Sequence, residues 1–92
     1  MKITRKYLES QINTINTMLG TPLEPYTFDV VLKPSIGSYH ISIAYGGYAL
    51  HRLVNERGGV NDVFNKGHMT AKELSLLMEG FISGMTLIKE MK

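Results

Sequence analysis

Cysteine and tryptophan are both absent from this 92-residue chain, and net charge is small. Without cysteine there can be no disulfide framework and no thiolate metal site, which fits a reducing cytosol. Ten basic residues against eight acidic ones leave a formal net charge of only +2. That is too little for the clustered basic face that DNA binding usually needs. A basic group at Lys2, Arg5 and Lys6 could contact nucleic acid weakly, but it is more typical of a solubility feature.

Long apolar runs are also missing from the sequence. No stretch approaches the roughly 20 apolar residues that span a bilayer, and no apolar signal region follows the first basic residues. We therefore expect a cytoplasmic chain that does not enter a membrane. We also expect a single domain over residues 1–92 with a small core. Self-association is a common way for such a chain to bury more surface.

Both ends of the chain carry the periodicity of amphipathic helices. Over residues 4–19 apolar residues recur every three or four positions, and Gly20 stands where a left-handed C-terminal cap belongs. A second apolar stripe covers residues 71–91. Thr70 and Glu73 match the capping box that begins a helix. These features predict one helix at each end.

The middle of the chain alternates between apolar and polar residues, as half-buried strands do. Turn signals at Gly46-Gly47 and in the NERGG segment separate four predicted strands, which cover residues 27–34, 38–45, 48–54 and 60–64. The predicted order is α-β-β-β-β-α. This is an α+β fold in which an antiparallel meander carries both helices on its apolar face.

The turns predict a specific strand register. A two-residue hairpin at Gly46-Gly47 places Ile43 opposite Leu50, and the first strand pairs with the second so that both hairpins share one apolar face. Continuing across NERGG places Arg52 opposite Asp62. We therefore expect these two residues to form a cross-strand ion pair on or beside the core face.

The polar face of the same sheet collects residues that could carry chemistry. The register puts Asp29, Ser42 and His51 side by side, with His40 diagonal to His51. These are the residue types of a catalytic triad, but Ser42 would lie between the acid and the base, whereas the base must lie between the other two. A metal bound by His40, His51 and Asp29 is less favoured than a polar surface that contacts a partner. We therefore expect no catalytic residues, no metal and no enzyme activity. His68, before the last helix, is expected to be an exposed loop residue.

The glycine-rich stretch between residues 44 and 64 has two interpretations. Its spacing does not match a phosphate-binding loop, because a strand rather than a helix follows the glycines. Most of these glycines are therefore predicted to form turns. The alternative is a nest of backbone N–H groups at Arg57, Gly58 and Gly59, which could bind an anion.

The last helix has a second feature beside its main apolar stripe. Gly80 and Gly84 lie on one flank together with Leu76 and Leu87. Glycine inside a helix costs about 0.5–1 kcal/mol against alanine. Two glycines on one flank therefore predict the close approach of another element. That element is either the first helix or, in a homodimer, a second copy of the chain.

The pattern Y-G-G-Y…N-E-x-G-G-x-x-D resembles a group of short accessory proteins of tailed phages and prophages. The residues that carry the resemblance are Tyr45, Gly46, Gly47, Tyr48, Arg52, Asn55, Glu56, Gly58, Gly59 and Asp62. The similar part covers most of the chain, while Arg57 and the NKGHM segment depart from the pattern. The resemblance implies a viral accessory protein in bacterial cytoplasm. It implies no catalytic residues, since the group carries no assigned activity.

Taken together, these features predict a non-enzymatic protein without a cofactor that binds and modulates a host protein and forms a homodimer. A small-molecule binder for a nucleotide-like ligand is the alternative, and a weak nucleic-acid binder is a third reading. The candidate contact residues are Asp29, His40, Ser42, His51, Arg57, Gly58 and Gly59. The candidate dimer residues are Leu76, Gly80, Gly84 and Leu87.

Overall fold

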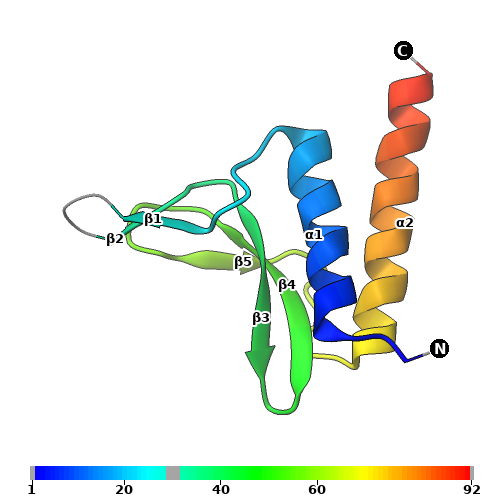
Figure 1. Ribbon diagram of the computed structural model, residues 1–92, viewed down its shortest axis with the longest axis horizontal. Coiled ribbons are helices and arrows are strands. Elements are labelled where there is room, and N and C mark those ends of the chain that lie inside the picture. Colours follow the sequence, from blue (N-terminus) through cyan, green and yellow to red (C-terminus); the bar gives the residue numbers. More distant parts are fainter. Residues whose placement is uncertain (1, 29–31, 92) are drawn as a thin grey trace.

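A computed structural model describes residues 2–28 and 32–91 of the chain (Figure 1). Both helices lie on one side of the antiparallel strands, which confirms the predicted α+β class (Figure 1). In chain order the elements are α1 (Arg5–Leu19), β1 (Tyr26–Phe28), β2 (Leu32–Pro34), β3 (Tyr39–Ala44), β4 (Gly47–Leu53), β5 (Val60–Asp62) and α2 (Ala71–Glu90).

Local capping contacts define both helices, as predicted. At the start of α1 the Thr4 side chain accepts a hydrogen bond from the Tyr7 backbone N–H. The helix ends at Gly20, whose φ of 70° is the left-handed conformation that glycine adopts without steric cost. At the start of α2, Thr70 and Glu73 form the reciprocal capping box.

The hydrophobic core lies between the two helices and the sheet. Its fully or almost fully buried members come from α1, β4 and α2, and are Leu8, Ile12, Ile15, Leu50, Leu74 and Met78. Aromatic residues pack around this cluster, with the rings of Tyr39 and Phe64 each edge-on to Phe81. The predicted apolar stripes therefore face the core over most of their length, whereas Leu19 at the end of α1 and Ile88 near the end of α2 are exposed.

The pairing predicted for the first strand, by contrast, is wrong for the residues that the structure describes. Neither β1 nor β2 pairs with β3. Instead, β1 and β2 pair with each other, with Thr27 opposite Lys33, in a two-stranded sheet separate from β3–β4–β5. The Asn16 side chain of α1 supplies one physical reason, because it bonds both the N–H and the C=O of Tyr39, each at 2.9 Å. A buried amide thus takes the place of a neighbouring strand at the start of β3. Asp29 and Val30, which the predicted register used, lie outside the described residues.

The hairpin between β3 and β4 is present, but its turn is one residue earlier than predicted. Tyr45 and Gly46 form the turn with φ angles of 54° and 72°, as expected for a primed two-residue hairpin. Gly47 instead begins β4, where an added Cβ would lie 3.0 Å from the Met69 carbonyl oxygen. The register shifts by two residues, so Ile41 rather than Ile43 faces Leu50. A shift of two preserves the faces, and the predicted apolar face is therefore retained.

The register between β4 and β5 shifts by one residue, which moves side chains to the other face. Asp62 lies opposite His51, and Arg52 lies opposite Asn61. The predicted Arg52–Asp62 ion pair is therefore wrong. The Arg52 guanidinium instead lies 5.7 Å from the centre of the Tyr39 ring. Within the described ranges the ion pair that forms is Arg5–Glu9, on the surface of α1.

Neither helix among residues 2–28 and 32–91 is long and apolar enough to cross a membrane.

Candidate functional site

Three histidines line up on the face of the sheet that points away from the helices. His40 of β3 and His51 of β4 are direct neighbours in the ladder, and their ring centres lie 5.9 Å apart. The ring of His68, from the loop between β5 and α2, lies 5.9 Å from His51. All three rings meet their neighbours edge-to-face. We call the group formed by His40, Ser42, His51, Asp62 and His68 the histidine face.

Short polar contacts attach the loop of His68 to the sheet. The Ser42 hydroxyl and His68 Nε2 lie 2.9 Å apart and share a hydrogen bond. One residue earlier, the Gly67 N–H donates to Asp62 Oδ2 at 2.8 Å. One residue later, Met69 pairs with Tyr48 of β4 through two backbone hydrogen bonds of 2.8 Å. His68 is therefore a partly buried member of the histidine face, and the prediction that it is an exposed loop residue is wrong.

Burial and mutual repulsion make protonation of this face unfavourable. Burial is the main cause that lowers the pKa of His40, and the nearby His51 lowers it further. Burial also lowers the pKa of His51, and although the Asp62 carboxylate acts in the opposite direction, His68 adds to the lowering. His40 and His51 are therefore mainly neutral near pH 7, and charging both of them together is costly.

The histidine face does not have the geometry of a hydrolase site. His68 is hydrogen-bonded to Ser42, but among the described residues no carboxylate accepts a hydrogen bond from its ring. The Asp62 carboxylate bonds the Gly67 backbone instead. A catalytic base needs an acid that orients it as well as a nucleophile that it activates. Within the described ranges, no three histidine and acidic side chains are placed to share a metal ion either.

Three of the seven candidate contact residues lie on the histidine face, which also includes two residues from outside that set. His40, Ser42 and His51 come together as predicted, although His40 lies directly opposite His51 rather than diagonal to it. Asp29 lies outside the described residues. His68 and Asp62 complete the face, and the sequence pattern missed both roles. The contact between Ser42 and His68 joins residues 26 positions apart, which no local periodicity can indicate.

The glycine nest is already occupied by a side chain of its own loop. Asn55 Oδ1 accepts hydrogen bonds from the backbone N–H groups of Arg57 and Gly59, each at 2.9 Å. This oxygen stands where an anion would bind. The anion-binding interpretation of Arg57, Gly58 and Gly59 is therefore wrong, and these residues form an internally satisfied turn.

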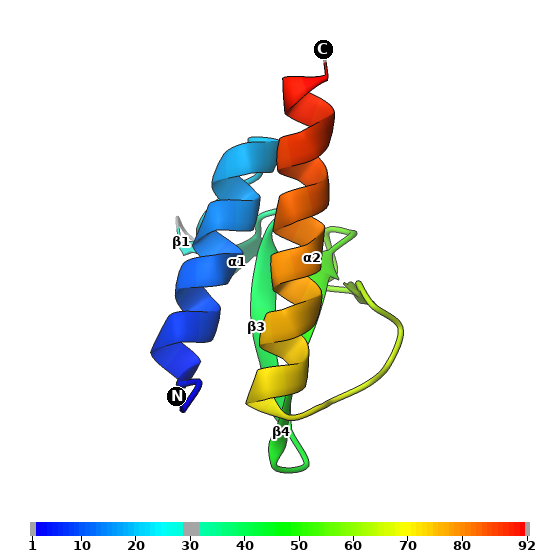
Figure 2. The same cartoon turned by 90° about the vertical axis from the view of Figure 1, so that its right-hand side faces the viewer.

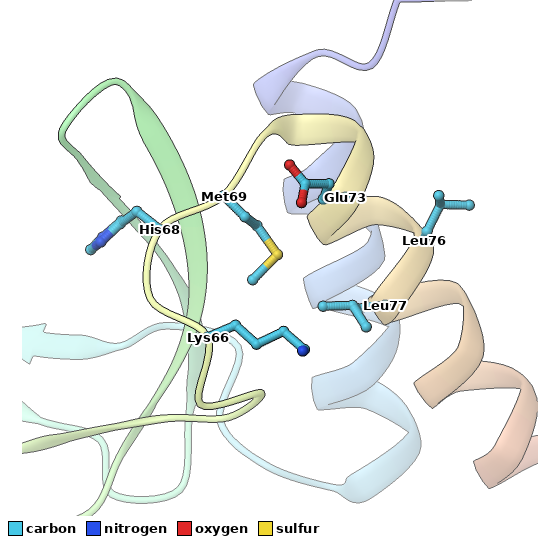
Figure 3. Close-up of a pocket in the computed structure, with 6 residues that line it drawn as sticks. All are labelled: Lys66, His68, Met69, Glu73, Leu76 and Leu77. Atoms are coloured by element: carbon cyan, nitrogen blue, oxygen red, sulfur yellow. The ribbon is translucent and has the colours of Figure 1, made fainter.

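An open depression of about 520 Å³ lies between the His68 loop and the first turns of α2 (Figure 3). Figure 3 shows the side chains of Lys66 and Leu77 reaching toward each other across it, with Met69 above them and Glu73 at the upper end. The His68 ring points to the opposite side, toward the strands, and Leu76 points away from the depression. The depression therefore combines an apolar floor with one charge of each sign.

The Gly80–Gly84 flank of α2 faces open space. A Cβ added at Gly80 or at Gly84 would meet no atom within 4 Å, so the alternative in which α1 packs closely against this flank is wrong. Beside the glycines, Leu76 and Leu87 are each 58% exposed, and Met91 is 77% exposed. We call Leu76, Gly80, Gly84, Leu87 and Met91 the α2 strip.

The described residues thus offer three distinct surfaces, namely the histidine face, the depression of Figure 3 and the α2 strip. Comparison of the chain with family models, with curated protein sequences and with solved structures finds no match.

Proposed function

We propose that this chain is a non-enzymatic accessory protein of phage or prophage type, which binds a bacterial host protein in the cytoplasm and modulates it. The observation that carries the host contact is the exposed side of the sheet, where polar and aromatic side chains of the histidine face gather. The homodimer contact rests on the α2 strip, whose leucines and methionine expose large apolar side chains along one side of the helix. Exposed apolar side chains on one side of a helix are typical of a surface that contacts another chain.

The α2 strip serves in this proposal as the contact between two copies of the chain. Gly80 and Gly84 leave the helix backbone open to approach, because they carry no side chain and face open space. A second α2 can come close to the backbone there, and the exposed leucines then pack around the crossing point. Burial of Leu76, Leu87 and Met91 removes apolar surface from water, which is the main favourable term in association. The sheet side of each copy stays free for the host protein.

The lack of a catalytic arrangement on the histidine face supports a binding role over an enzymatic one. Ser42 and His68 form a hydrogen-bonded pair without an orienting acid. Their environment is the surface of a sheet and not an enclosed cleft. Polar and aromatic side chains on an open surface are suited to contacting another protein.

A second candidate function is the binding of a small amphipathic ligand in the depression of Figure 3. Lys66 could pair with an anionic group of the ligand, while Met69 and Leu77 contact its apolar part. One oxygen of Glu73 is already used by the Thr70 backbone and hydroxyl in the capping box. The depression is open, whereas tight small-molecule sites bury most of their ligand. For this reason we place this function second.

The test is capture of a bacterial partner on the immobilised chain, followed by reconstitution of the complex from purified components. The expected result is a stoichiometric complex that survives gel filtration. Heat-unfolded chain on the same support is the control for non-specific adsorption. If no purified bacterial protein forms a stoichiometric complex, the proposed function is overturned. If a small metabolite co-purifies instead, and Lys66→Ala releases it, the second candidate replaces the first.

A further inference from the structure

The outer edge of β3 carries backbone groups without partners. The strand order β3-β4-β5 puts β3 at one edge of its sheet. The Ser38 carbonyl accepts a hydrogen bond from Leu53, so the backbone of Ser38 faces β4. Tyr39, the next residue, turns its N–H and C=O outward to Asn16. Because strand residues alternate, the N–H and C=O groups of Ile41 and Ile43 also point outward. No described residue hydrogen-bonds to these four groups.

This edge lacks the usual protection against strand pairing. In natural proteins, lysine, proline or a bulge on an edge strand often prevents it from pairing with a further strand. β3 has the sequence YHISIA, continues for six residues without a bulge, and contains neither lysine nor proline. Ile43 is 47% exposed beside the free backbone groups. Only the first position is covered, by Asn16. Ile41 and Ile43 therefore remain available as a template for one more strand.

A groove runs beside this edge under α1. It has a volume of about 380 Å³ and is lined by residues of α1, the following loop and β3, among them Arg5, Glu9, Leu23, Pro25, Tyr39 and Ile41. Figure 2 shows α1 beyond β3, on the side away from β4. The helix therefore lies over one face of the place where a fourth strand would extend the sheet, and the groove leaves room beside the backbone edge of β3. The sequence pattern assigned that place to residues 27–34, but their described strands pair with each other.

We propose that this edge binds an extended peptide segment of the partner protein, which adds to β3 as a fourth strand. The inference rests on the proposed function, since it names how the partner is recognised. Two residues of the peptide, separated by one, exchange hydrogen bonds with the N–H and C=O groups of Ile41 and Ile43. Side chains on one face of the peptide meet a wall that is apolar at Ile12 and Leu23 and charged at Arg5 and Glu9, so we expect an apolar residue beside Leu23 and a polar one beside Arg5 and Glu9. Side chains on the other face lie beside the histidine face, so these are polar.

A second copy of the chain does not fit this place as well as a single peptide. A second β3 would bring its own α1, which packs against the same face of its strand. The α1 of the first copy already lies over that face beside β3 (Figure 2), so the two α1 helices would clash. A peptide strand that carries no helix on that face does not clash. The occupant is therefore an extended segment from another protein.

The experiment uses as its probe the tightest peptide selected from a random-peptide library on the immobilised full chain. The peptide is resynthesised in two versions, one with the amides of its odd-numbered residues N-methylated and one with those of its even-numbered residues N-methylated. N-methylation removes main-chain donors and keeps the side chains. We expect one version to weaken binding about tenfold or more and the other to bind like the parent, because only every second residue of an added strand faces β3. If both methylated peptides bind like the parent peptide, or if neither does, the proposal is overturned.

Matched variants of the chain locate the site. Ile43→Pro removes an outward N–H without removing a ladder bond to β4, which edge strands tolerate. It should weaken binding of the parent peptide about tenfold, while Ile43→Val and Thr86→Leu, at an exposed position of α2 outside the α2 strip, should leave it unchanged. Hydrogen exchange should slow at the amides of Ile41 and Ile43 when the peptide is bound. If Thr86→Leu abolishes binding instead, or no peptide is selected, the proposal is overturned. Should Ile43→Pro fail to fold, the two methylated peptides decide alone.

The outcome is separable from that of the proposed function. A purified partner that forms a stoichiometric complex with both wild type and Ile43→Pro at equal affinity would overturn the strand-addition proposal and leave the interaction role intact. Failure of every purified partner to bind would overturn the interaction role, whatever peptides are selected.

Discussion

Single polar side chains decide how this small domain is assembled. Asn16 is almost fully buried, yet its amide bonds both backbone groups of Tyr39 and also accepts a hydrogen bond from the Thr21 hydroxyl. It joins α1 to the first residue of β3. A buried polar group of this kind contributes mainly because its loss would leave several partners unsatisfied.

Replacing Asn16 should therefore be unusually costly for a single polar substitution. Asn16→Ala leaves the N–H and C=O of Tyr39 without hydrogen-bond partners. We therefore expect a loss of about 2–3 kcal/mol in the free energy of unfolding. Urea denaturation measures it. Asn13→Ala, at an exposed position of the same helix, is the matched control and should change stability by less than about 0.5 kcal/mol. Equal midpoints for the two variants would show that Asn16 does not link α1 to β3.

The histidine face predicts a dependence of stability on pH. Histidine in the unfolded chain titrates near 6.5, and the folded-state pKa values of His40 and His51 lie lower. Below about pH 6.5 the unfolded chain therefore binds more protons than the folded chain, so acidification favours unfolding. The stability is fully present above that pH and is lost as the pH falls toward the folded-state values.

Urea unfolding at about pH 7.5 and about pH 5.5 tests this dependence. Wild type should be less stable at the lower pH, and the double variant His40→Gln, His51→Gln should show a smaller difference between the two conditions. A double variant with the same pH dependence as wild type would assign the effect to other groups.

We also expect Ser42 not to act as a nucleophile. Its hydroxyl is bonded to His68, but no described carboxylate orients that ring. An activated ester offered to the purified chain should be hydrolysed at the rate of buffer alone. Turnover that disappears in both Ser42→Ala and His68→Gln would prove this expectation wrong.

At the scale of the elements, the helices follow from the sequence and the strand registers do not. Local sequence signals predict both helices, namely apolar periodicity, the Thr70–Glu73 capping box and the glycine cap at Gly20. These signals act within one or two turns, so no tertiary information is needed. The helix bounds could be predicted for this reason.

The strand registers depend on contacts that periodicity does not contain. Asn55 fills the loop between β4 and β5 and shifts the pairing by one residue, which brings Asp62 to the histidine face. Asn16 occupies the start of the β3 edge. His68 reaches Ser42 from a loop that was predicted to be exposed. Three of the five residues of the histidine face, His40, Ser42 and His51, could therefore be predicted. Asp62 depends on the register of β5 and His68 on a contact made by a loop, so these two could not.

The exposed glycines of α2 give a prediction that belongs to this element. Because an added Cβ would meet no atom at either position, Gly80→Ala and Gly84→Ala should each stabilise the isolated monomer by about 0.5–1 kcal/mol through helix propensity. Thermal unfolding at low protein concentration measures it. Destabilisation by either alanine would indicate a close contact inside the chain, contrary to the open flank.

At the scale of the whole molecule, the two proposed contacts lie on different sides. The α2 strip lies on the helical layer, and the free edge of β3 lies in the sheet layer (Figure 1). A dimer formed through α2 would carry two β3 edges, each open to its own partner segment. Two linked sites raise the apparent affinity for a partner that presents two segments.

Sedimentation equilibrium of the purified chain measures most directly whether the α2 strip holds two copies together. We expect wild type to be dimeric at micromolar concentration and Gly84→Leu to be monomeric, because a leucine side chain would push the two helices apart. Thr86→Leu, which adds the same side chain on the other flank of α2, should remain dimeric. A wild-type chain that stays monomeric at every concentration, or a Gly84→Leu variant that associates like wild type, would contradict the account.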